Sequence, residues 1–236
     1  MVRIGTAGWE IGADVRARFP AAGSRLERYA ARFPCVEINS SFYRPHRPST
    51  YARWAASVPE TFRFALKVPR TITHERRLVG AEDALDAFLA ETSALGDRRG
   101  VLLVQLPPSL AFDADVVAAF LEAVRARYAA PLACEPRNAT WFDGNADALL
   151  ARYDVARVGA DPAVAAHAAE PGGWDGFAYR RLHGSPRTYY SEYDDAALRA
   201  VAARLRASRC PSWCIFDNTA SGAATANALD LASLVR

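Results

Sequence analysis

Two stretches of sequence decide the fold: FRFALK, which spans Phe62–Lys67, and GVLLVQ, which spans Gly100–Gln105. Each is a short apolar run that ends in a polar residue, which is typical of a buried strand in an α/β protein. Lys67 is the only lysine among 29 basic residues, and Gln105 is the only glutamine. Because a chain that otherwise uses arginine keeps lysine where a compact ammonium is needed, these two strand ends are predicted to carry chemistry.

Further strand-like runs occur on both sides of these two stretches. Counted together with them, the sequence predicts eight strands, at Val2–Thr6, Val36–Asn39, Phe62–Val68, Val101–Leu106, Leu132–Glu135, Val155–Ala160, Phe177–His183 and Trp213–Asp217. Amphipathic helices are predicted between most of them, at Arg25–Phe33, Ser49–Val58 (opened by a Ser/Thr cap pair), Ala81–Leu95, Asp113–Tyr128, Asn145–Tyr153, Asp195–Ser208 and Ala223–Val235.

Strands that alternate with helices in this way predict an α/β protein of the (β/α)₈ TIM type. The interval Pro162–Gly176 contains the Pro-Gly-Gly break Pro171–Gly173 and has little room for a full helix, so we expect an irregular connection between the sixth and seventh strands. Since no linker or change of composition divides the chain, we expect a single domain over residues 1–236.

Composition narrows the class of protein. The chain is 51% hydrophobic and has a net charge of +3, which permits an acidic partner without requiring one. No run of basic residues predicts a nucleic-acid arm, and the four cysteines have no CxxC spacing. No apolar run approaches the roughly 18 residues that a membrane span needs. We therefore expect a cytoplasmic protein that does not contact the membrane.

The alternation of side chains along the strands predicts where polar groups meet. In a barrel of parallel strands, one face of each strand meets the helices and the other faces the interior. The interior-facing polar residues near the carboxyl ends of the strands are expected to gather at one rim: Glu37, Asn39, Lys67, Gln105, Glu135, Arg137, Asp161, Arg181 and His183. Because active sites of this fold lie at that rim, we expect the functional site there.

Seven stretches of the chain resemble the DUF72 (YecE-like) family, in the order of that family and over nearly the whole chain. They are GTAGW (Gly5–Trp9), VEINSSFYR (Val36–Arg44), FALKVPRTITH (Phe64–His74), LLVQLPPS (Leu102–Ser109), EPRNATW (Glu135–Trp141), YRRLHG (Tyr179–Gly184) and FDNTASGAATANA (Phe216–Ala228). The resemblance implies a TIM-type barrel, and it implies no activity, since none is assigned to the family.

The family motifs also imply a set of polar site residues. They fall on Glu37, Asn39, Tyr43, Lys67, Arg70, His74, Gln105, Glu135, Arg137, Arg181, His183 and Asn218. The sequence departs from the motifs at two positions. Asn138 replaces the usual histidine, which argues against a proton carrier there, and Asp217 replaces an asparagine and adds a negative charge near the rim.

These residues favour an enzyme that uses acid–base chemistry on a small anionic substrate. Lys67, Arg137 and Arg181 are predicted to bind a phosphate or carboxylate, because cations at one mouth repel one another unless anions balance them. Lys67 is also expected to be catalytic, as a charge clamp or a general acid. Glu135 and Glu37 are expected to act as bases or orienting carboxylates, and His183 is expected to carry a proton. Substrate-binding roles are expected for Asn39, Tyr43, Arg70, His74, Gln105, Asp161 and Asn218.

Two other functions stay open on the sequence. The acidic and histidine residues of the rim could hold a divalent metal, as in a metal-dependent phosphodiesterase or nuclease, although no HxH or HExxH spacing is present. Nucleic acid is then a partner with weak support, and we predict no metal ligands or cofactor. The third alternative is a barrel that binds a ligand without catalysis, because this fold has many uses.

Overall fold

A computed structural model of the chain describes residues 1–235. The strands are β1 (Val2–Thr6), β2 (Cys35–Ile38), β3 (Arg63–Lys67), β4 (Arg99–Gln105), β5 (Leu132–Glu135), β6 (Val155–Arg157), β7 (Gly159–Asp161), β8 (Gly172–Gly173), β9 (Ala178–Leu182) and β10 (Ser212–Phe216). The α-helices are α1 (Arg25–Ala30), α2 (Ser40–Tyr43), α3 (Pro48–Ala56), α4 (Glu82–Thr92), α5 (Ala114–Arg125), α6 (Asn145–Arg152), α7 (Asp195–Ala207) and α8 (Ala223–Val235).

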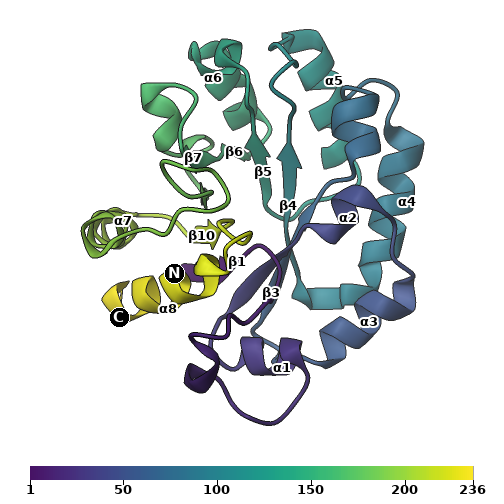
Figure 1. Cartoon of the computed structure of the whole chain (residues 1–236). Helices are drawn as coiled ribbons and strands as arrows, with labels where there is room; N and C mark the ends of the chain where they lie inside the picture. The colour runs from purple at the N-terminus through teal and green to yellow at the C-terminus, as the bar shows by residue number, and fades with distance from the viewer. Residues whose placement is uncertain (236) are drawn as a thin grey trace.

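The strands form two sheets that follow one another around the molecule. One sheet has the order β2-β3-β4-β5-β6-β8 and the other β1-β10-β9-β7, and every pairing except that of β6 with β8 is parallel. A parallel bridge between Ala7 and Glu37 joins the ends of β1 and β2. In Figure 1 the larger helices lie outside the strands. The predicted TIM-type fold is confirmed.

Both sheets contribute side chains to one interior. An apolar cluster combines residues from the two sheets, namely Cys35, Ala65, Val101, Leu103, Ala133, Ala156, Val158, Phe177, Tyr179, Trp213 and Ile215. The opposite faces of the same strands, such as Phe64, Leu102 and Phe216, pack in the larger core that includes the helices. The alternation of interior and helix-facing residues therefore agrees with the sequence pattern. The polar residues that continue this alternation lie at the carboxyl ends of the strands.

The predicted sixth strand, Val155–Ala160, is divided in the structure. Val155–Arg157 pairs with β5, whereas Gly159–Asp161 pairs with β9 in the other sheet. Gly159 lies at this break, and a Cβ atom there would lie 2.8 Å from the carbonyl oxygen of Ala169. The close approach of the next loop thus requires glycine at the point where one predicted strand becomes two.

The connection after β7 is irregular, as expected. Residues Pro162–Gly176 contain only a single turn at Ala166–Ala169 and the two-residue strand β8, which the sequence did not predict. The expected cap pair at Ser49 and Thr50 is wrong, because α3 begins earlier with Arg47 as its N-cap and Pro48 in its first turn. Proline suits that position, since its missing N–H has no helical partner there.

Three short elements at the mouth escaped the sequence pattern. They are α2, a π-helical turn at Thr71–Glu75 and a 3₁₀ turn at Ala139–Phe142. Each follows the carboxyl end of a strand and is shorter than the window over which helical periodicity can be recognised. Within residues 1–235, no helix has the length and apolar character that crossing a membrane requires. The assignment of the chain to a single domain stays a prediction.

Candidate active site at the mouth of the barrel

A buried network of ion pairs, here called the central ion network, occupies the middle of the mouth. Its members are Arg181, His183, Glu37, Glu135 and Asp217. The fully buried guanidinium of Arg181 donates to all three carboxylates, at 2.6 Å to Glu37 Oε1, 2.7 Å to Glu135 Oε2 and 2.9 Å to Asp217 Oδ2. Arginine suits this position because its fork of donors can reach several carboxylates at once.

His183 connects two of these carboxylates. Its Nδ1 lies 3.0 Å from Asp217 Oδ2 and its Nε2 lies 2.9 Å from Glu135 Oε1. Burial alone would lower the pKa of His183, but the charge of Glu135 and the hydrogen bonds to both carboxylates raise it. The doubly protonated ring is therefore favoured, because both nitrogens can then donate to a carboxylate.

Two carboxylates of the network, Glu135 and Asp217, are held ionised by their neighbours. Burial would raise the pKa of Glu135, but Arg181, His183 and Arg137 hold it well below its usual range. Burial likewise opposes the charge of Asp217, and Arg181 and His183 lower its pKa. Glu37 also accepts a hydrogen bond of 2.8 Å from the Tyr179 hydroxyl. The oxygens of Glu37 and Glu135 are thus occupied by protein donors, which is typical of orienting carboxylates.

Lys67 has very different surroundings from Arg181. Its side chain is 7% exposed and, among residues 1–235, has no hydrogen bond or ion pair. The ammonium lies 4.1 Å from the centre of the Phe42 ring, and the Lys67 carbonyl accepts a hydrogen bond from Ser41. Burial, followed by the positive charge of Arg181, lowers the pKa of Lys67 to about 8. Lys67 can therefore exchange a proton close to neutral pH.

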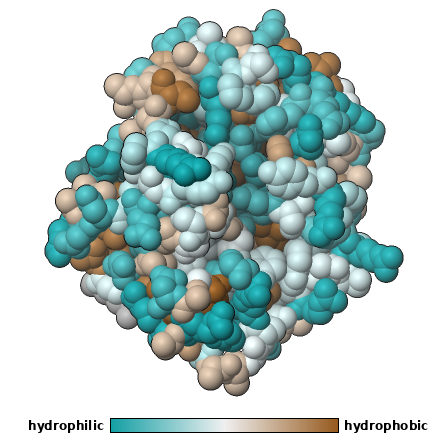
Figure 2. Space-filling view, in the orientation of Figure 1, coloured by the Kyte–Doolittle hydropathy of each residue, from teal (hydrophilic) through white to brown (hydrophobic). Residues whose placement is uncertain are grey.

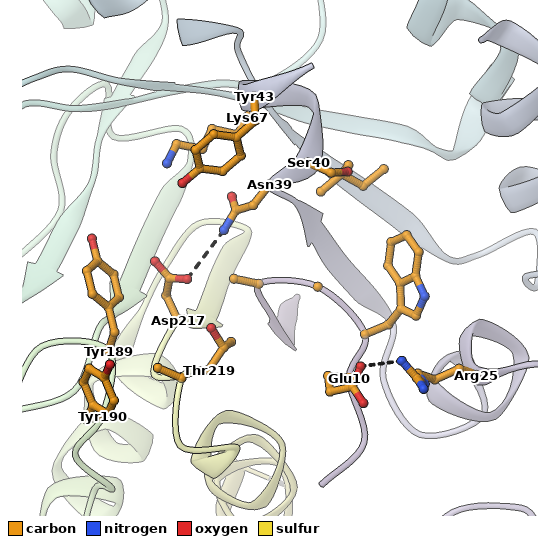
Figure 3. Close-up of a pocket in the computed structure, with 15 residues that line it drawn as sticks. Glu10, Arg25, Asn39, Ser40, Tyr43, Lys67, Tyr189, Tyr190, Asp217 and Thr219 are labelled. Carbon is orange, nitrogen blue, oxygen red and sulfur yellow. Dashed lines mark hydrogen bonds and ion pairs between the residues drawn. The ribbon is translucent and has the colours of Figure 1, made fainter. Parts of the chain in front are cut away.

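A cavity of about 600 Å³, here called the main cavity, opens beside Lys67. Asn39, Tyr43, Lys67, Tyr189 and Asp217 surround one end of this space (Figure 3). Asn39 Nδ2 donates to Asp217 Oδ1 at 3.5 Å, which leaves that carboxylate oxygen only a weak protein partner. Figure 2 shows a hollow with hydrophilic lining near the middle of the face drawn there.

Aromatic side chains supply walls for the main cavity. Of the aromatic residues near the strand ends, Trp9, Tyr43, Tyr189 and Tyr190 line it. Tyr189 adopts a φ of +70°, which is rare for a residue other than glycine. Its carbonyl accepts from Ala220 N, and its hydroxyl lies 3.4 Å from Arg137 Nη1. Such strained residues cluster at functional sites, where the surrounding contacts hold them in place.

Several residues expected at the site lie elsewhere. Arg70 pairs with Glu75 at the surface, and the Asp161 carboxylate accepts from the Tyr193 hydroxyl at 2.7 Å. Asn218 is fully buried and donates to Ser191 O and Asn227 Oδ1, so it anchors the loop before α7. Gln105 is buried and pairs in register with Glu135, but its side chain makes no hydrogen bond to the central ion network.

His74 and Arg137 lie on the edge of the site. His74 Nδ1 lies 2.8 Å from Thr73 Oγ1, and burial and the charge of Lys67 lower its pKa. Arg137 donates from Nε and Nη2 to Glu135 Oε1, at 3.1 and 2.9 Å. Asn138 donates to Pro108 O and accepts from Thr140 N, so it acts as a cap for the turn that follows. His74 and Arg137 can contact a ligand, whereas Asn138 has a local structural role.

Asp217 is the network residue that the predicted site omitted. Its alternation with Trp213 and Ile215, which both face the interior, is the signal that would have found it. The same alternation places Asp161 on the opposite face from Val158, and Asn218 on the opposite face from Asp217. Among residues 1–235, no group of three or more His, Cys, Asp or Glu side chains is arranged to hold a metal ion. Glu37, Glu135 and Asp217 contact Arg181 instead.

Comparison with known proteins places the chain beside proteins whose function is unassigned. A model of the family described as "Protein of unknown function DUF72" matches residues 3–236. The UPF0759 protein YecE of Escherichia coli strain K12 is 36% identical over 107 residues, which cover 45% of this chain and 38% of YecE. The UPF0759 protein YunF of Bacillus subtilis strain 168 is 28% identical over 148 residues, 60% of this chain and 52% of YunF. The chain thus spans between about a third and a half of these relatives.

Solved structures support the fold. A DUF72 family protein of Enterococcus faecalis superposes with a TM-score of 0.84 at 21% identity, covering 100% of this chain and 95% of that one. A DUF72 family protein of Thermotoga maritima gives a TM-score of 0.78 at 22% identity, with coverages of 100% and 99%. D-psicose 3-epimerase of Clostridium cellulolyticum superposes with a TM-score of 0.52 at 10% identity, covering 99% of this chain and 98% of that one. At such identities the likeness concerns the fold alone.

Proposed function

Because the chain belongs to the DUF72 family of proteins of unknown function, we propose its function from the chemistry of the mouth: it binds a small anionic molecule in the main cavity and performs acid–base chemistry on it. The anion carries a phosphate or a carboxylate. Lys67 contacts the anion and donates a proton to it. The central ion network holds the surrounding side chains in position.

The observation that carries this proposal is the unpaired charge of Lys67. A buried cation without an ion-paired carboxylate is costly, because burial removes water and the more distant charges of Glu37, Glu135 and Asp217 offset only part of that loss. Arg181, by comparison, has three carboxylates within 2.9 Å. An anionic ligand in the main cavity would supply the missing partner. Since the pKa of Lys67 is lowered to about 8, the ammonium can act as a general acid near neutral pH.

The other residues have supporting roles in this proposal. Asp217 Oδ1 accepts a hydrogen bond from a hydroxyl or amine of the substrate, since its protein partner is weak. Asn39 and Tyr43 line the same space and orient polar groups. Glu37 and Glu135 fix Arg181 and Arg137 and do not act as bases, because their oxygens already accept protein hydrogen bonds.

Binding of sulfate tests the anion site directly, because the charge of sulfate is constant near neutral pH. We expect its affinity, measured by isothermal titration calorimetry, to fall as the pH rises through about 8, where Lys67 loses its proton. Lys67→Met should weaken binding at pH 7 by at least about tenfold, equivalent to about 1.4 kcal/mol. Lys67→Arg should bind sulfate without the step near pH 8. Arg199→Met, in an exposed pair with Asp195, is the matched control.

Catalysis is tested separately from binding. Mass spectrometry of the small molecule that co-purifies with the protein identifies the ligand, and incubation then shows whether it is converted. We expect conversion by the wild-type protein and none by Lys67→Arg, because a guanidinium does not donate its proton at neutral pH. Sulfate affinity that is unchanged in Lys67→Met would remove the anion site from this cavity. A ligand recovered intact after long incubation would indicate a binding protein instead.

A further inference from the structure

A second cavity, here called the side cavity, lies on the far side of Arg137 and His183. Its volume is about 350 Å³, within the range of sites that bind small molecules. It shares no lining residue with the main cavity. Tyr189 contributes to the division, because its hydroxyl lies near Arg137 and its ring meets the edge of the His183 ring at 5.7 Å between centroids.

The side cavity has an apolar body and a charged floor. Val158 lines it from the break between β6 and β7, Ala160 from β7, Phe142 from the turn after β5, and Val164 from the loop after β7. Val164 is 49% exposed although it is a large aliphatic residue. Apolar walls with a few polar groups at one end are typical of sites that bind small organic ligands.

The charge of the floor favours an anion. Arg137 and His183 line the cavity together with Glu135, which is the only carboxylate among its lining residues. Arg181 is paired with Glu37 and Asp217 as well as Glu135, so Arg137 is the cation of this lining whose charge Glu135 alone offsets. Arg137 is also the more accessible partner, with 21% of its side chain exposed against 1% for Glu135.

We infer that the side cavity binds a small carboxylic acid with an apolar body, whose carboxylate accepts a hydrogen bond from Arg137 Nη1 and whose body packs against Val158, Ala160 and Phe142. A guanidinium with exposed donors suits a carboxylate, and a volume of about 350 Å³ accommodates an aromatic or short aliphatic acid. This site differs from the main cavity in its polar groups, and its occupancy does not depend on the proposed function.

Benzoate, benzyl alcohol and benzylamine are the probes that test this inference, because they share a ring and differ in charge. We expect benzoate to bind at millimolar concentrations in saturation-transfer NMR and calorimetry, with benzyl alcohol at least about tenfold weaker and benzylamine showing no binding. Absence of benzoate binding, or equal binding of the alcohol, would overturn the inference.

Variants of residues that line the side cavity show whether benzoate binds there. Ala160→Leu should weaken benzoate binding at least about tenfold by filling the cavity, whereas Ala119→Leu, in a separate surface hollow beside α5, should leave it unchanged. The exposed Val164 permits a second pair that does not disturb the core: Val164→Glu should weaken binding by repelling the carboxylate, and Val164→Gln should not. Benzoate binding that is indifferent to both pairs would contradict the assignment.

Lys67→Met separates this inference from the proposed function. Because Lys67 lies in the main cavity and not in the side cavity, the variant should lose sulfate and retain benzoate. Ala160→Leu should do the reverse. Loss of benzoate in Lys67→Met would show that the probe occupies the main cavity and would overturn the side cavity as its site, while leaving the sulfate result to decide the proposed function.

Discussion

On the β9 side of the mouth, Arg181 is fully buried and donates to Glu37, Glu135 and Asp217. On the β3 side, Lys67 is almost equally buried, and its ammonium has an aromatic ring as its neighbour and no carboxylate within ion-pair distance. Both cations follow interior positions of parallel strands. What differs is whether the protein supplies the counter-charge, and this difference separates a group that holds the site together from one that is available to a ligand.

A paired and an unpaired buried cation have opposite energetic consequences. A buried charge that is fully paired costs little as long as every partner remains, but removal of one partner leaves uncompensated charges in a low dielectric. A buried charge without a partner is unfavourable in the free protein, and a ligand of opposite charge relieves that cost. The folded state should therefore depend on Arg181, and ligand affinity should depend on Lys67.

The largest change in stability is expected from Arg181→Met. Removing the guanidinium leaves Glu37, Glu135 and Asp217 facing one another, and we expect the free energy of unfolding to fall by about 3–5 kcal/mol. Urea unfolding followed by circular dichroism measures this. Arg199→Met removes an exposed pair with Asp195, and its cost should stay within about 0.5 kcal/mol.

Arg181→Lys sharpens this first prediction. The variant keeps one positive charge but loses the fork of donors, so its stability should lie between those of the wild-type protein and Arg181→Met. If Arg181→Met were as stable as Arg199→Met, the central ion network would not hold the mouth together. The claim that the folded state depends on Arg181 would then be wrong.

The alternation of residues along the strands accounts for how much could be predicted. The predicted strand positions were enough to predict the TIM-type fold. They also predicted that Glu37, Glu135, Arg181 and His183 lie close together, because interior residues at corresponding positions of neighbouring parallel strands lie side by side. The same rule applied to β10 would have added Asp217, and applied to β7 it would have removed Asp161. The contact of Asp161 with Tyr193 and the place of Asp217 in the central ion network thus follow a signal that the sequence contains.

Other features of the site could not be read from the sequence. The positions of Arg70 and His74 depend on a π-helical turn of five residues, which is too short to show a periodicity. The division of the mouth into two cavities depends on the conformation of Tyr189 and on its contact with Arg137. Such contacts join residues far apart in the chain, and no local pattern encodes them.

Lys67→Met is expected to change the free energy of unfolding by a smaller amount and in the opposite direction. Replacing an unpaired buried ammonium by an apolar side chain of similar length removes the cost of burying the charge, so stability at pH 7 should rise by about 1–2 kcal/mol. Lys67 also affects the pH dependence. Its pKa falls from 10.5 to about 8 on folding, so between these values Lys67 holds more protons in the unfolded chain, and the stability of the wild-type protein relative to Lys67→Met should increase with pH.

Thermal unfolding of both proteins between pH 7 and 10.5 measures this pH dependence. Burial raises the pKa of Cys35, Cys134 and Cys214 in both proteins, so the rise is expected in the difference between them. The wild-type protein should gain stability relative to Lys67→Met as the pH rises from about 8 to 10.5. Lys67→Arg provides the matched control, because it keeps a charge at this position that does not titrate in the range. A loss of stability in Lys67→Met at pH 7 would mean that the ammonium has a stabilising protein partner, which would contradict the contrast with Arg181.

The smallest effect is expected from His183→Gln, which probes the paired side of the mouth without removing Arg181. Glutamine keeps a hydrogen-bond donor but cannot carry the positive charge between Glu135 and Asp217. We expect a loss of about 1 kcal/mol at pH 5, the net contribution of a typical intramolecular hydrogen bond, because glutamine retains part of the hydrogen bonding. Urea unfolding at pH 5 compares the variant with the wild-type protein.

The pH dependence of His183→Gln separates charge from packing. The pKa of His183 is raised above its ordinary value of 6.5 by folding, so its contribution is fully present below 6.5 and is lost as the pH rises through the folded-state value. The wild-type protein should therefore lose stability above pH 6.5 by an amount that the variant does not lose. Parallel curves for the two proteins from pH 5 to 9 would show that folding does not shift the pKa of His183, which would contradict this expectation. A wild-type protein that instead gains stability relative to the variant between pH 5 and 6.5 would show that the ring is neutral when folded. The histidine would then act as a neutral hydrogen-bond partner, and the negative charge of the network would depend on Arg181 and Arg137 for its balance.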